Sequence, residues 1–471
     1  MGNQKSQLYL NNKELGDFFV SKLAYYSDNY KFSKAYKTGK WDGKIRFGTY
    51  NHPFLTFGTG LLINVLNLLQ RNNIEYIVQD TRIMPKKEFN TCTSYELRPY
   101  QKEAVDAAIK NQRGVIWAPT ASGKTVTFSS LIAELGVPTL ILVRNKDLMM
   151  QTMNRILEDL KLDTIGCIGN SIIQPAEFVT VGMLQTLSSM RENSIKNFNK
   201  LMSYFQCLIV DEAHAINANA KTFTKVVENI PSFYRFAFTA TPKRTEYDTA
   251  TDITLVSCFG PVIHHVSRRE LVDQGYLVDT NIVIVLNKKS EGMTREDYLE
   301  NYTTPQEAYR AAWNDYIFND VNRVPIIQDI LKKHNGEQIL IMCDSVELAE
   351  KFGEELHLQV VTGTTESHLR ESIYNDFRSG KIKQLIATNI YSEGVDFTQL
   401  NVVVLAEPFR SPIKLLQRIG RGMRIHEGKN TSIVYDIADI TSPFFDKQYA
   451  YRRKMYDKEE ILYSFVKGEI I

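Results

Sequence analysis

The chain has 471 residues, with 56 Lys and Arg against 54 Asp and Glu. No run reaches the ~18 apolar residues of a membrane helix, and the N-terminus lacks the charged-then-apolar plan of a secretory signal. The five cysteines are scattered and form no Cys-x-x-Cys pair, which argues against a zinc site and predicts reduced thiols in a cytoplasmic protein. A length of this size predicts about three domains.

Residues 1–90 are predicted to form a small basic α+β domain, the front domain. They contain 13 Lys and Arg against 7 Asp and Glu, and apolar spacing predicts helices over 14–26 and 58–70. Between these helices, basic and aromatic residues are interleaved over 30–47, and Asp42-Gly43 is typical of a hairpin turn. Cations that neutralise phosphates and rings that stack on bases indicate a nucleic-acid surface, with candidate contacts at Lys37, Lys40, Trp41, Lys44 and Arg46. The alternative for the rings is that they face the core of a solvated hairpin.

Residues 91–267 alternate apolar strands with helices, which predicts a parallel sheet covered on both faces. The expected strands are 114–118, 139–143, 178–182, 207–211 and 235–240. Ligands of such sheets bind at the carboxyl ends of the strands. The first strand ends in Ala118-Pro119-Thr120-Ala121-Ser122-Gly123-Lys124-Thr125, and a helix over 126–135 follows, ending at Gly136.

This order of strand, small-residue loop and helix is the context of a P-loop. Thr120, Ser122 and Gly123 are predicted to bring backbone N–H groups around phosphate oxygens, helped by the positive end of the helix dipole. Lys124 would reach the β- and γ-phosphates, and the Thr125 hydroxyl would bind Mg²⁺. Ala118 replaces the first glycine of the usual motif. The predicted cofactors are therefore ATP and Mg²⁺.

A second strand end carries the acidic pair of Leu208-Ile209-Val210-Asp211-Glu212-Ala213-His214. If its strand is a neighbour of the first, the pair lies beside the P-loop. Asp211 would then bind Mg²⁺, and Glu212 would orient and deprotonate the attacking water. The ordinary alternative is that Asp211 caps a helix.

Residues 268–440 are predicted to form a second α/β lobe without a P-loop. Its expected strands are 281–286, 338–343, 359–363, 383–389, 402–407 and 432–436. Polar groups at the strand ends are suited to holding a phosphate backbone, and they are Gly363, Thr364, Thr388 and Asn389. Residues 441–471 are predicted to form a helical tail that docks on the rest.

Asp-Glu-Ala-His after a Gly-Lys-Thr loop resembles the superfamily 2 helicases, and further motifs of that family follow in order over 97–440. Residues 97–101 resemble the adenine-side motif, which implies nucleotide binding by Arg98 and Gln101. Residues 143–148 and 181–187 resemble the strand-contacting motifs, which implies nucleic-acid contacts at Arg144, Gly182, Gln185 and Thr186. Residues 238–244 resemble the coupling motif, which implies coupling roles for His214, Thr239 and Thr241.

The second lobe carries the two remaining motifs. Residues 390–396 resemble the fifth, in which Gly394 gives close backbone approach and Asp396 contacts the ribose. Residues 417–424 resemble the sixth, with Gln417, Arg421 and Arg424 as its catalytic members. The two arginines share one helical face, and an arginine finger contributes ~10³–10⁵ in rate. The resemblance implies two tandem RecA-like lobes that close around ATP and open after hydrolysis.

The front domain, with Lys40-Trp41-Asp42-Gly43-Lys44-Ile45-Arg46, and the two-lobe motor after it are similar to the bacteriophage branch-migration helicases of the UvsW type. This likeness implies a monomeric, ATP-dependent DNA helicase of the host cytoplasm. It would unwind or branch-migrate forked and four-way DNA in replication, recombination or repair. The alternatives are an RNA helicase, a double-strand DNA translocase that separates no strands, and an ATP-gated nucleic-acid clamp without turnover.

Overall fold

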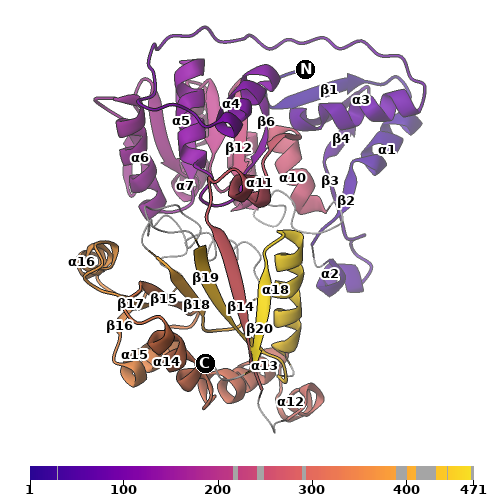
Figure 1. Ribbon diagram of the computed structural model, residues 1–471. Coiled ribbons are helices and arrows are strands. Elements are labelled where there is room, and N and C mark those ends of the chain that lie inside the picture. The colour runs from indigo at the N-terminus through magenta and orange to yellow at the C-terminus, as the bar shows by residue number, and fades with distance from the viewer. Residues whose placement is uncertain are drawn as a thin grey trace. The chain divides into compact units, whose positions relative to one another are not determined.

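The computed structural model describes the chain except for residues 29, 216–220, 241–248, 289–292, 389–399, 410–430, 443 and 468–471. It forms two compact units (Figure 1). The first comprises Met1–Pro119 and Gly123–Val266, and the second comprises Ser267–Ile471 with the loop residues Thr120–Ser122. The first unit therefore contains both the front domain and the first α/β lobe.

The front domain is built on two small antiparallel sheets, β1-β5-β4 and β2-β3. The helices α1 and α3 cover it, and their Phe19, Val65 and Leu69 are almost fully buried with Leu55 and Phe57 of β5. Its elements are β1 (Lys5–Tyr9), α1 (Lys13–Lys22), β2 (Ala24–Tyr26), η1 (Tyr30–Phe32), α2 (Lys34–Lys37), β3 (Lys44–Arg46), β4 (Gly48–Asn51), β5 (Phe54–Gly58), η2 (Thr59–Leu61) and α3 (Leu62–Arg71).

The first lobe contains an eight-stranded sheet in the order β13-β6-β12-β11-β7-β10-β8-β9, parallel except for the β8–β9 hairpin. Gly136 ends α5 in a left-handed conformation, as a helix C-cap requires. The elements are α4 (Pro99–Asn111), β6 (Arg113–Trp117), α5 (Lys124–Leu135), β7 (Thr139–Val143), α6 (Lys146–Leu160), β8 (Gly166–Gly169), β9 (Ile172–Gln174), β10 (Val179–Met183), α7 (Leu184–Asn193), α8 (Ile195–Met202), β11 (Cys207–Val210), η3 (Ala213–Ala215), α9 (Lys221–Glu228), β12 (Tyr234–Thr239), α10 (Ala250–Phe259) and β13 (Val262–His265).

Two apolar clusters lie on opposite faces of this sheet because alternate strand residues point to opposite sides. Ile116 and Ile209 pack with residues of α4, α5 and α6. Val115 and Leu208, one position earlier in the same strands, pack with residues of α7, α8, α9 and α10. This double cover explains why the strands are continuous apolar runs rather than alternating ones.

The front domain is fixed to the first lobe through α10. Ile253 of α10 belongs to the apolar core of the front domain. A Cβ atom on Gly60 would lie 1.9 Å from the carbonyl oxygen of Val256, so only glycine allows η2 to approach α10 this closely. Asn3 adds a hydrogen bond from its Nδ2 to the carbonyl of Pro231, at 3.0 Å. These contacts join the two parts into one body.

An extended connection over 72–98 runs from the front domain across the first lobe (Figure 1). The backbone N–H groups of Glu88 and Phe89 donate to the carbonyl of Gly136, at 2.7 and 3.0 Å. The Phe89 ring stacks on Phe178, with ring centroids 4.5 Å apart. This polar segment is therefore held along the lobe surface by specific contacts.

The second unit contains a seven-stranded parallel sheet in the order β16-β17-β15-β18-β19-β14-β20. Ile341, Val404 and Ile437 pack with α13, α14 and α15. The elements are α11 (Arg268–Asp273), β14 (Asp279–Asn287), α12 (Arg295–Asn301), α13 (Pro305–Trp313), η4 (Asn314–Phe318), α14 (Arg323–Lys333), β15 (Ile339–Met342), α15 (Val346–Leu356), β16 (Gln359–Val361), α16 (Ser367–Arg378), β17 (Gln384–Ala387), β18 (Val402–Leu405), β19 (Thr431–Asp439), α18 (Asp446–Lys458) and β20 (Tyr463–Lys467).

The predicted fold class, a basic α+β domain before two RecA-like lobes with parallel sheets, is confirmed. Two details differ from the prediction. The segment after residue 440 contains a helix, α18, but also β20, which pairs in parallel with β14 and so completes the sheet of the second lobe. In the front domain, the expected hairpin at Asp42-Gly43 is instead the end of a long connection between β2 and β3 that contains η1 and α2.

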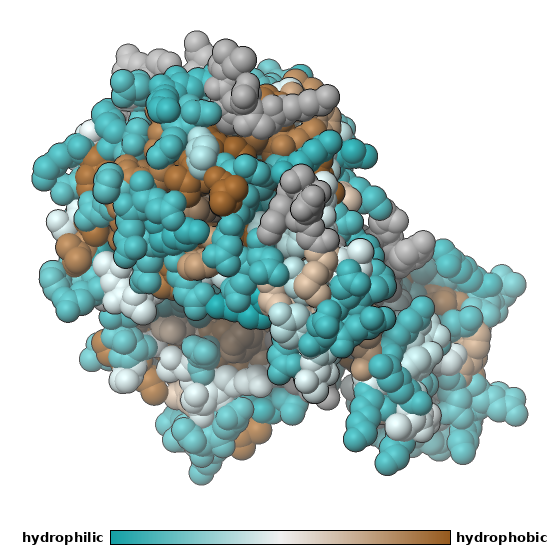
Figure 2. Space-filling model, turned by 90° about the horizontal axis from the view of Figure 1, so that it is seen from below, coloured by the Kyte–Doolittle hydropathy of each residue, from teal (hydrophilic) through white to brown (hydrophobic). Residues whose placement is uncertain are grey.

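The surface visible in Figure 2 is mainly hydrophilic, with separate hydrophobic patches. Over the described part of the chain, no helix combines the length and apolar character needed to cross a membrane.

Candidate active site

The loop between β6 and α5 has the backbone of a phosphate-binding turn. Ala121 and Gly123 have positive φ values, +67° and +78°. The φ of Gly123 strains any residue with a side chain, and a Cβ atom there would also lie 2.7 Å from Nε2 of Gln101, so glycine favours closure of the loop. Gly123 directly precedes Lys124, the first residue of α5. The loop therefore presents backbone N–H groups at a helix N-terminus, where anions bind.

Two polar side chains of the loop support this assignment. The Thr120 hydroxyl is buried and has no hydrogen-bond partner among the described residues. Lys124 Nζ lies 3.4 Å from the carbonyl oxygen of Pro119, within the loop itself. A buried hydroxyl without a partner costs free energy, and phosphate oxygens would satisfy it. The predicted roles of Thr120 and Lys124 are thus compatible with the geometry.

The acidic pair lies at the end of β11, as expected, but β11 is not a neighbour of β6. Strand β12 lies between them. The assumption that the strand before the acidic pair directly neighbours the strand before the P-loop is therefore wrong. Long side chains nevertheless span the gap, since Lys124 Nζ lies 3.7 Å from Glu212 Oε1. Glu212 has a φ of +48°, and its backbone N–H donates to Asp211 Oδ1 at 2.9 Å.

The environment of Glu212 favours its ionised form. Burial acts to raise its pKa, but Lys124, His214 and Arg144 together outweigh burial and lower the pKa to about 2. A carboxylate so stabilised is a weak base. If bound phosphate drew Lys124 away from Glu212, one of the cations that lower the pKa of Glu212 would be lost. The pKa of Glu212 would then rise, and the carboxylate would become a stronger general base.

A chain of polar contacts leads from Glu212 away from the loop. His214 Nδ1 lies 3.2 Å from Glu212 Oε2, and His214 Nε2 lies 3.4 Å from Arg144 Nη1. Arg144 stands between β7 and α6 and is exposed overall, whereas His214 is buried. His214 thus contacts both the predicted catalytic base and a predicted nucleic-acid contact.

Thr125 and Asp211 supply a hydroxyl and a carboxylate, which are oxygen ligands of the type that Mg²⁺ takes. Both side chains are half-buried, the first at the start of α5 and the second just beyond β11. These residues fit the ion, which when bound would neutralise charge on the phosphate oxygens.

The predicted adenine-side residues lie beside the phosphate loop. Gln101 is buried, and its Oε1 accepts a hydrogen bond from the Arg98 backbone N–H at 3.1 Å. The Gln101 side chain therefore both caps α4 and borders the turn at Gly123. Contacts with a base by Arg98 and Gln101 stay a prediction.

Of the coupling residues, Thr239 ends β12 and is fully buried, and its carbonyl accepts from the Ala118 N–H at 3.2 Å. The coupling motif and the phosphate loop are therefore in direct contact through their backbones. Thr241 lies outside the described residues.

The predicted nucleic-acid contacts of the first lobe differ in exposure. Gln185 is exposed and Thr186 half-buried, both in the first turn of α7. Gly182 is buried within β10, and a Cβ there would lie 3.3 Å from a Leu142 methyl group. Strand pairing encloses Gly182 between β7 and β8, which leaves little of it for a ligand, and a nucleic-acid contact there stays a prediction.

In the second lobe, Gly363 and Thr364 are exposed in the loop before α16, and a side chain on Gly363 would meet open space. Thr388 is buried at the end of β17, and its N–H donates to the Val361 carbonyl at 3.1 Å, which leaves little of it for a ligand. The remaining predicted residues of this lobe lie outside the described residues: Asn389, Gly394, Asp396, Gln417, Arg421 and Arg424.

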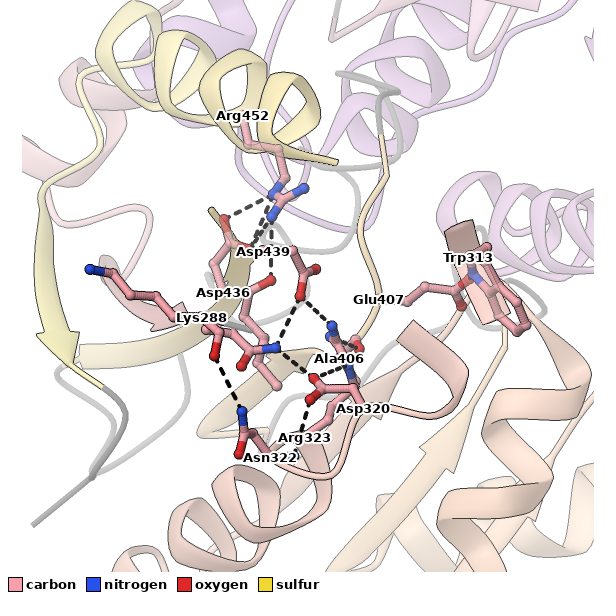
Figure 3. Close-up of polar contacts among 12 residues, drawn as sticks. Lys288, Trp313, Asp320, Asn322, Arg323, Ala406, Glu407, Asp436, Asp439 and Arg452 are labelled. Carbon is pink, nitrogen blue, oxygen red and sulfur yellow. Dashed lines mark hydrogen bonds and ion pairs between the residues drawn. The ribbon is translucent and has the colours of Figure 1, made fainter. Parts of the chain in front are cut away.

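Buried ion pairs fix both flanks of the segment that contains the predicted arginines. Arg452 of α18 reaches Asp436 of β19 (Figure 3), with Nη2–Oδ1 at 2.8 Å, and its Nη1 donates to the Phe409 carbonyl at 3.4 Å. Arg323 donates to the Ala406 carbonyl at 2.7 Å and pairs with Asp439. These contacts of Arg323 and Arg452, which we call the buried frame, hold the residues just before 410 and those of β19 in one arrangement.

Sequence reasoning missed this frame and Glu407 within it. Glu407 is buried, accepts from Trp313 Nε1 at 2.9 Å, and accepts from the Asp344 and Ser345 N–H groups at 2.8 Å each. The available signal was an acidic residue directly after an apolar strand, the same signal that identified Asp211.

The predicted contacts of the front domain form a mixed set. Lys37 and Lys40 are exposed. Trp41 is half-buried and donates from Nε1 to the Lys44 carbonyl at 2.9 Å. Lys44 Nζ lies 4.9 Å from the centre of the Tyr26 ring, and Arg46 pairs with Asp42 at 2.6 Å. Trp41 thus holds the turn together, whereas Lys37 and Lys40 present their charge to solvent.

Comparison with known proteins supports the motor assignment. The family "Type III restriction enzyme, res subunit" matches residues 94–244, and "Helicase conserved C-terminal domain" matches residues 322–426. A curated protein named DNA 3'-5' translocase XPB2, from Sulfurisphaera tokodaii, is 27% identical over 359 residues, which cover 70% of this chain and 79% of that protein.

Solved structures share the fold. The DNA-bound Type ISP restriction-modification enzyme LlaBIII matches with a TM-score of 0.60 at 17% identity, over 79% of this chain and 31% of its own. T4 UvsW matches over 97% of both chains at 20% identity, with a TM-score of 0.44. The predicted place within the UvsW-type branch is therefore not confirmed by these comparisons.

The two family matches together cover more than half of the chain, in the order expected for the two lobes. The first match contains the phosphate loop, the acidic pair and the coupling motif, and the second contains residues 417–424. These two matches indicate a helicase of superfamily 2, and together with the helicase-named relatives they support an ATP-dependent helicase.

Proposed function

We propose that this helicase is a DNA motor that unwinds or branch-migrates forked and four-way DNA. The observation that carries the proposal is that a basic front domain is joined to the ATP-binding lobe in one compact unit. Duplex held by that domain would move with the lobe through each ATP cycle. A relative that is named a DNA translocase supports DNA as the track.

The proposed cycle uses the residues of both lobes. Lys124 and the loop around Gly123 hold the phosphates, Thr125 and Asp211 hold Mg²⁺, and Glu212 accepts the proton of the attacking water. Arg421 and Arg424 supply positive charge to the transferring phosphoryl group, and Gln417 supplies a neutral amide as a hydrogen-bond donor beside it; these contacts close the lobes around ATP. Hydrolysis removes that charge pairing, so the lobes open.

The proposed DNA contacts belong to two classes. Three of them lie at the carboxyl ends of the neighbouring strands β7 and β10 of the first sheet. Arg144 is at the N-terminus of α6, and Gln185 and Thr186 are at the N-terminus of α7. Helix N-termini bind phosphates without reading bases, which suits movement along any sequence. Lys37 and Lys40 would hold the duplex arm.

The test compares ATPase and unwinding on single-stranded DNA, blunt duplex, forked DNA, a four-way junction and RNA. We expect the greatest stimulation by forked and four-way DNA. Greater stimulation by RNA would replace the proposal with an RNA helicase. Displacement of a protein block from duplex without strand separation would replace it with a double-strand translocase, and nucleic-acid binding without turnover would indicate a clamp.

A charge-reversal variant tests the front domain. Lys37→Glu with Lys40→Glu should weaken junction binding and flatten its salt dependence, because fewer phosphates are neutralised. Lys5→Glu with Lys13→Glu, which changes the charge equally in the same domain but outside 30–46, is the matched control. Equal losses in the two double variants would show that net charge, and not this surface, holds the DNA.

A further inference from the structure

Phe32 is the most exposed aromatic residue in the described part of the chain. Its exposed fraction is 77%, against 64% for Tyr9, the next in rank. It is the last residue of η1, in the connection between β2 and β3. A ring this exposed buries little area within its own domain, which leaves its aromatic face available to stack on a ligand.

The turn that carries Phe32 is built rigidly. The Tyr30 ring, two residues earlier, stacks on Tyr26 with centroids 4.5 Å apart and meets Tyr36 edge-on at 4.8 Å. A Cβ on Gly43 would lie 2.5 Å from the Tyr30 ring, so the glycine lets the backbone close over it. The Ser33 N–H donates to the Tyr30 carbonyl at 3.0 Å. The aromatic side chains around Tyr30 thus hold the turn, while Phe32 is left exposed.

Exposed cations surround Phe32 in the sequence and in the local structure. Lys31 precedes it, and Lys34 and Lys37 begin and end α2 directly after it. The two acidic residues of this connection are engaged elsewhere: Asp42 with Arg46, and Asp28 with the Thr251 hydroxyl. An apolar ring is therefore presented among exposed positive charges, of which Lys31 also lies 5.9 Å from the centre of the Tyr30 ring.

The contact between Asp28 and Thr251 also ties this turn to α10 of the first lobe. Phe32 lies four residues beyond Asp28, so the ring belongs to the same compact unit as Gly123 and Lys124, which begin the helix of the ATP-binding lobe. A ring fixed in this way would keep its position relative to the ATP-binding lobe during a cycle.

We propose that Phe32 stacks on the base face that is exposed where the strands of branched DNA separate, while Lys31, Lys34 and Lys37 hold the adjoining phosphates. Plain duplex offers phosphates along its whole length but no accessible base face away from its ends. The lysines therefore bind any DNA, and Phe32 distinguishes the branch point. Stacking tolerates all bases because each has an aromatic face, so this recognition needs no sequence. The inference rests on the proposed DNA-remodelling function and names the group that selects its substrate.

The test measures binding without ATP, by fluorescence anisotropy, to a fork and to a covalently closed duplex of equal length. Phe32→Ala should weaken fork binding about tenfold and leave duplex binding unchanged within about twofold. Phe32→Trp should restore fork binding, because indole also stacks. Tyr9→Ala, which removes an exposed ring elsewhere in the same domain, is the matched control and should change neither affinity. Circular dichroism of each variant checks the fold.

A 2-aminopurine base at the fork junction supplies a direct readout, since stacking changes its fluorescence. Wild type and Phe32→Trp should change the signal, and Phe32→Ala should not. Unaltered fork preference in Phe32→Ala, equal losses in Tyr9→Ala, or a wild type that prefers closed duplex would each overturn the inference. The binding assays do not depend on ATP turnover, so they test the role of Phe32 separately from the proposed function. The proposed function would instead fail if no DNA stimulated the ATPase of the wild type.

Discussion

The two α/β lobes have the same architecture but use their charged residues in opposite ways. In the first lobe, Lys124, Glu212 and His214 meet at the carboxyl edge of the sheet through contacts of 3.2–3.7 Å, looser than good hydrogen bonds. In the second lobe, Arg452 and Asp436 are about 1% exposed and share several contacts near 3 Å. Loose contacts can exchange for those of a ligand, whereas saturated ones define a frame.

The largest expected effect is on catalysis in the first lobe. Lys124→Ala should lower kcat of the ATPase at least about 100-fold, since it removes a cation that stabilises developing charge on the phosphoryl group. Lys110→Ala, an exposed lysine of α4, is the control. The melting temperature should change less than in the Arg452 variant described next. ATPase that survives in Lys124→Ala would refute the assignment of the loop.

The second lobe should show the reverse, a loss of stability. Arg452→Met leaves Asp436 buried without its partner, which should cost about 3–5 kcal/mol of unfolding free energy. Adding Asp436→Asn should recover part of this loss, because the unpaired charge is removed.

Arg453→Met is the matched control for the Arg452 variant, since Arg453 is the exposed neighbour on α18, and it should change stability by less than about 0.5 kcal/mol. Urea denaturation measures all of these variants. Equal stability of the Arg452 and Arg453 variants would contradict the proposed frame.

The polar chain from Glu212 to Arg144 should couple nucleic-acid binding to ATP turnover. His214→Ala should lower the ratio of stimulated to basal ATPase by about fivefold or more. Arg144→Ala should do the same, and the double variant should be no worse, because both changes interrupt one chain. Additive losses would show that the two residues act independently.

The low pKa of Glu212 predicts a pH dependence confined to acid conditions. Its pKa is about 2 in the folded chain, against an ordinary value of 4.5. The ionised form therefore stabilises the fold above pH 4.5, and this contribution fades as pH falls toward 2. Relative to Glu212→Gln, wild type should lose unfolding free energy between pH 5 and pH 3, measured by urea denaturation. Glu192→Gln, on the exposed side of α7, is the control.

The smallest effect is expected at Gly182. The Ala side chain of Gly182→Ala would meet leucine methyl groups at 3.3–3.4 Å, so stability should change by no more than about 1 kcal/mol. Nucleic-acid affinity should not change, because the residue is enclosed. A selective loss of affinity at unchanged stability would support Gly182 as a contact.

Local sequence patterns predicted the positions of the strands well, but they did not predict contacts between residues that are distant in the sequence. The apolar runs at 139–143 and 207–211 became β7 and β11 almost residue for residue, because short, unbroken apolar runs are typical of strands in a sheet covered on both faces. Strand order is different, since no spacing along the chain reveals that β12 separates β6 from β11. The contact of Lys124 with Glu212 depends on that order and on side-chain reach.

The front domain shows where local patterns mislead. The basic and aromatic stretch over 30–47 was predicted to contain a hairpin, yet its first residues form η1 and α2, in which Tyr30 contacts Tyr26 and Tyr36. Tertiary packing of the rings determined the conformation. Tertiary contacts also explain why β20 was not predicted, since its short segment forms a strand by pairing with β14.

The place of β14 in its sheet has a consequence for synthesis. It is the first strand of the second unit, yet both of its neighbours, β19 and β20, come later than every other strand of that sheet. Thr280 of β14 pairs with Ser432, 152 residues further along. At 5–20 residues per second, a ribosome needs roughly 8–30 s to deliver that partner. During this interval both edges of an apolar strand stay open to other chains, so a transcript that is cut short within the second lobe should yield aggregates and not a smaller working domain.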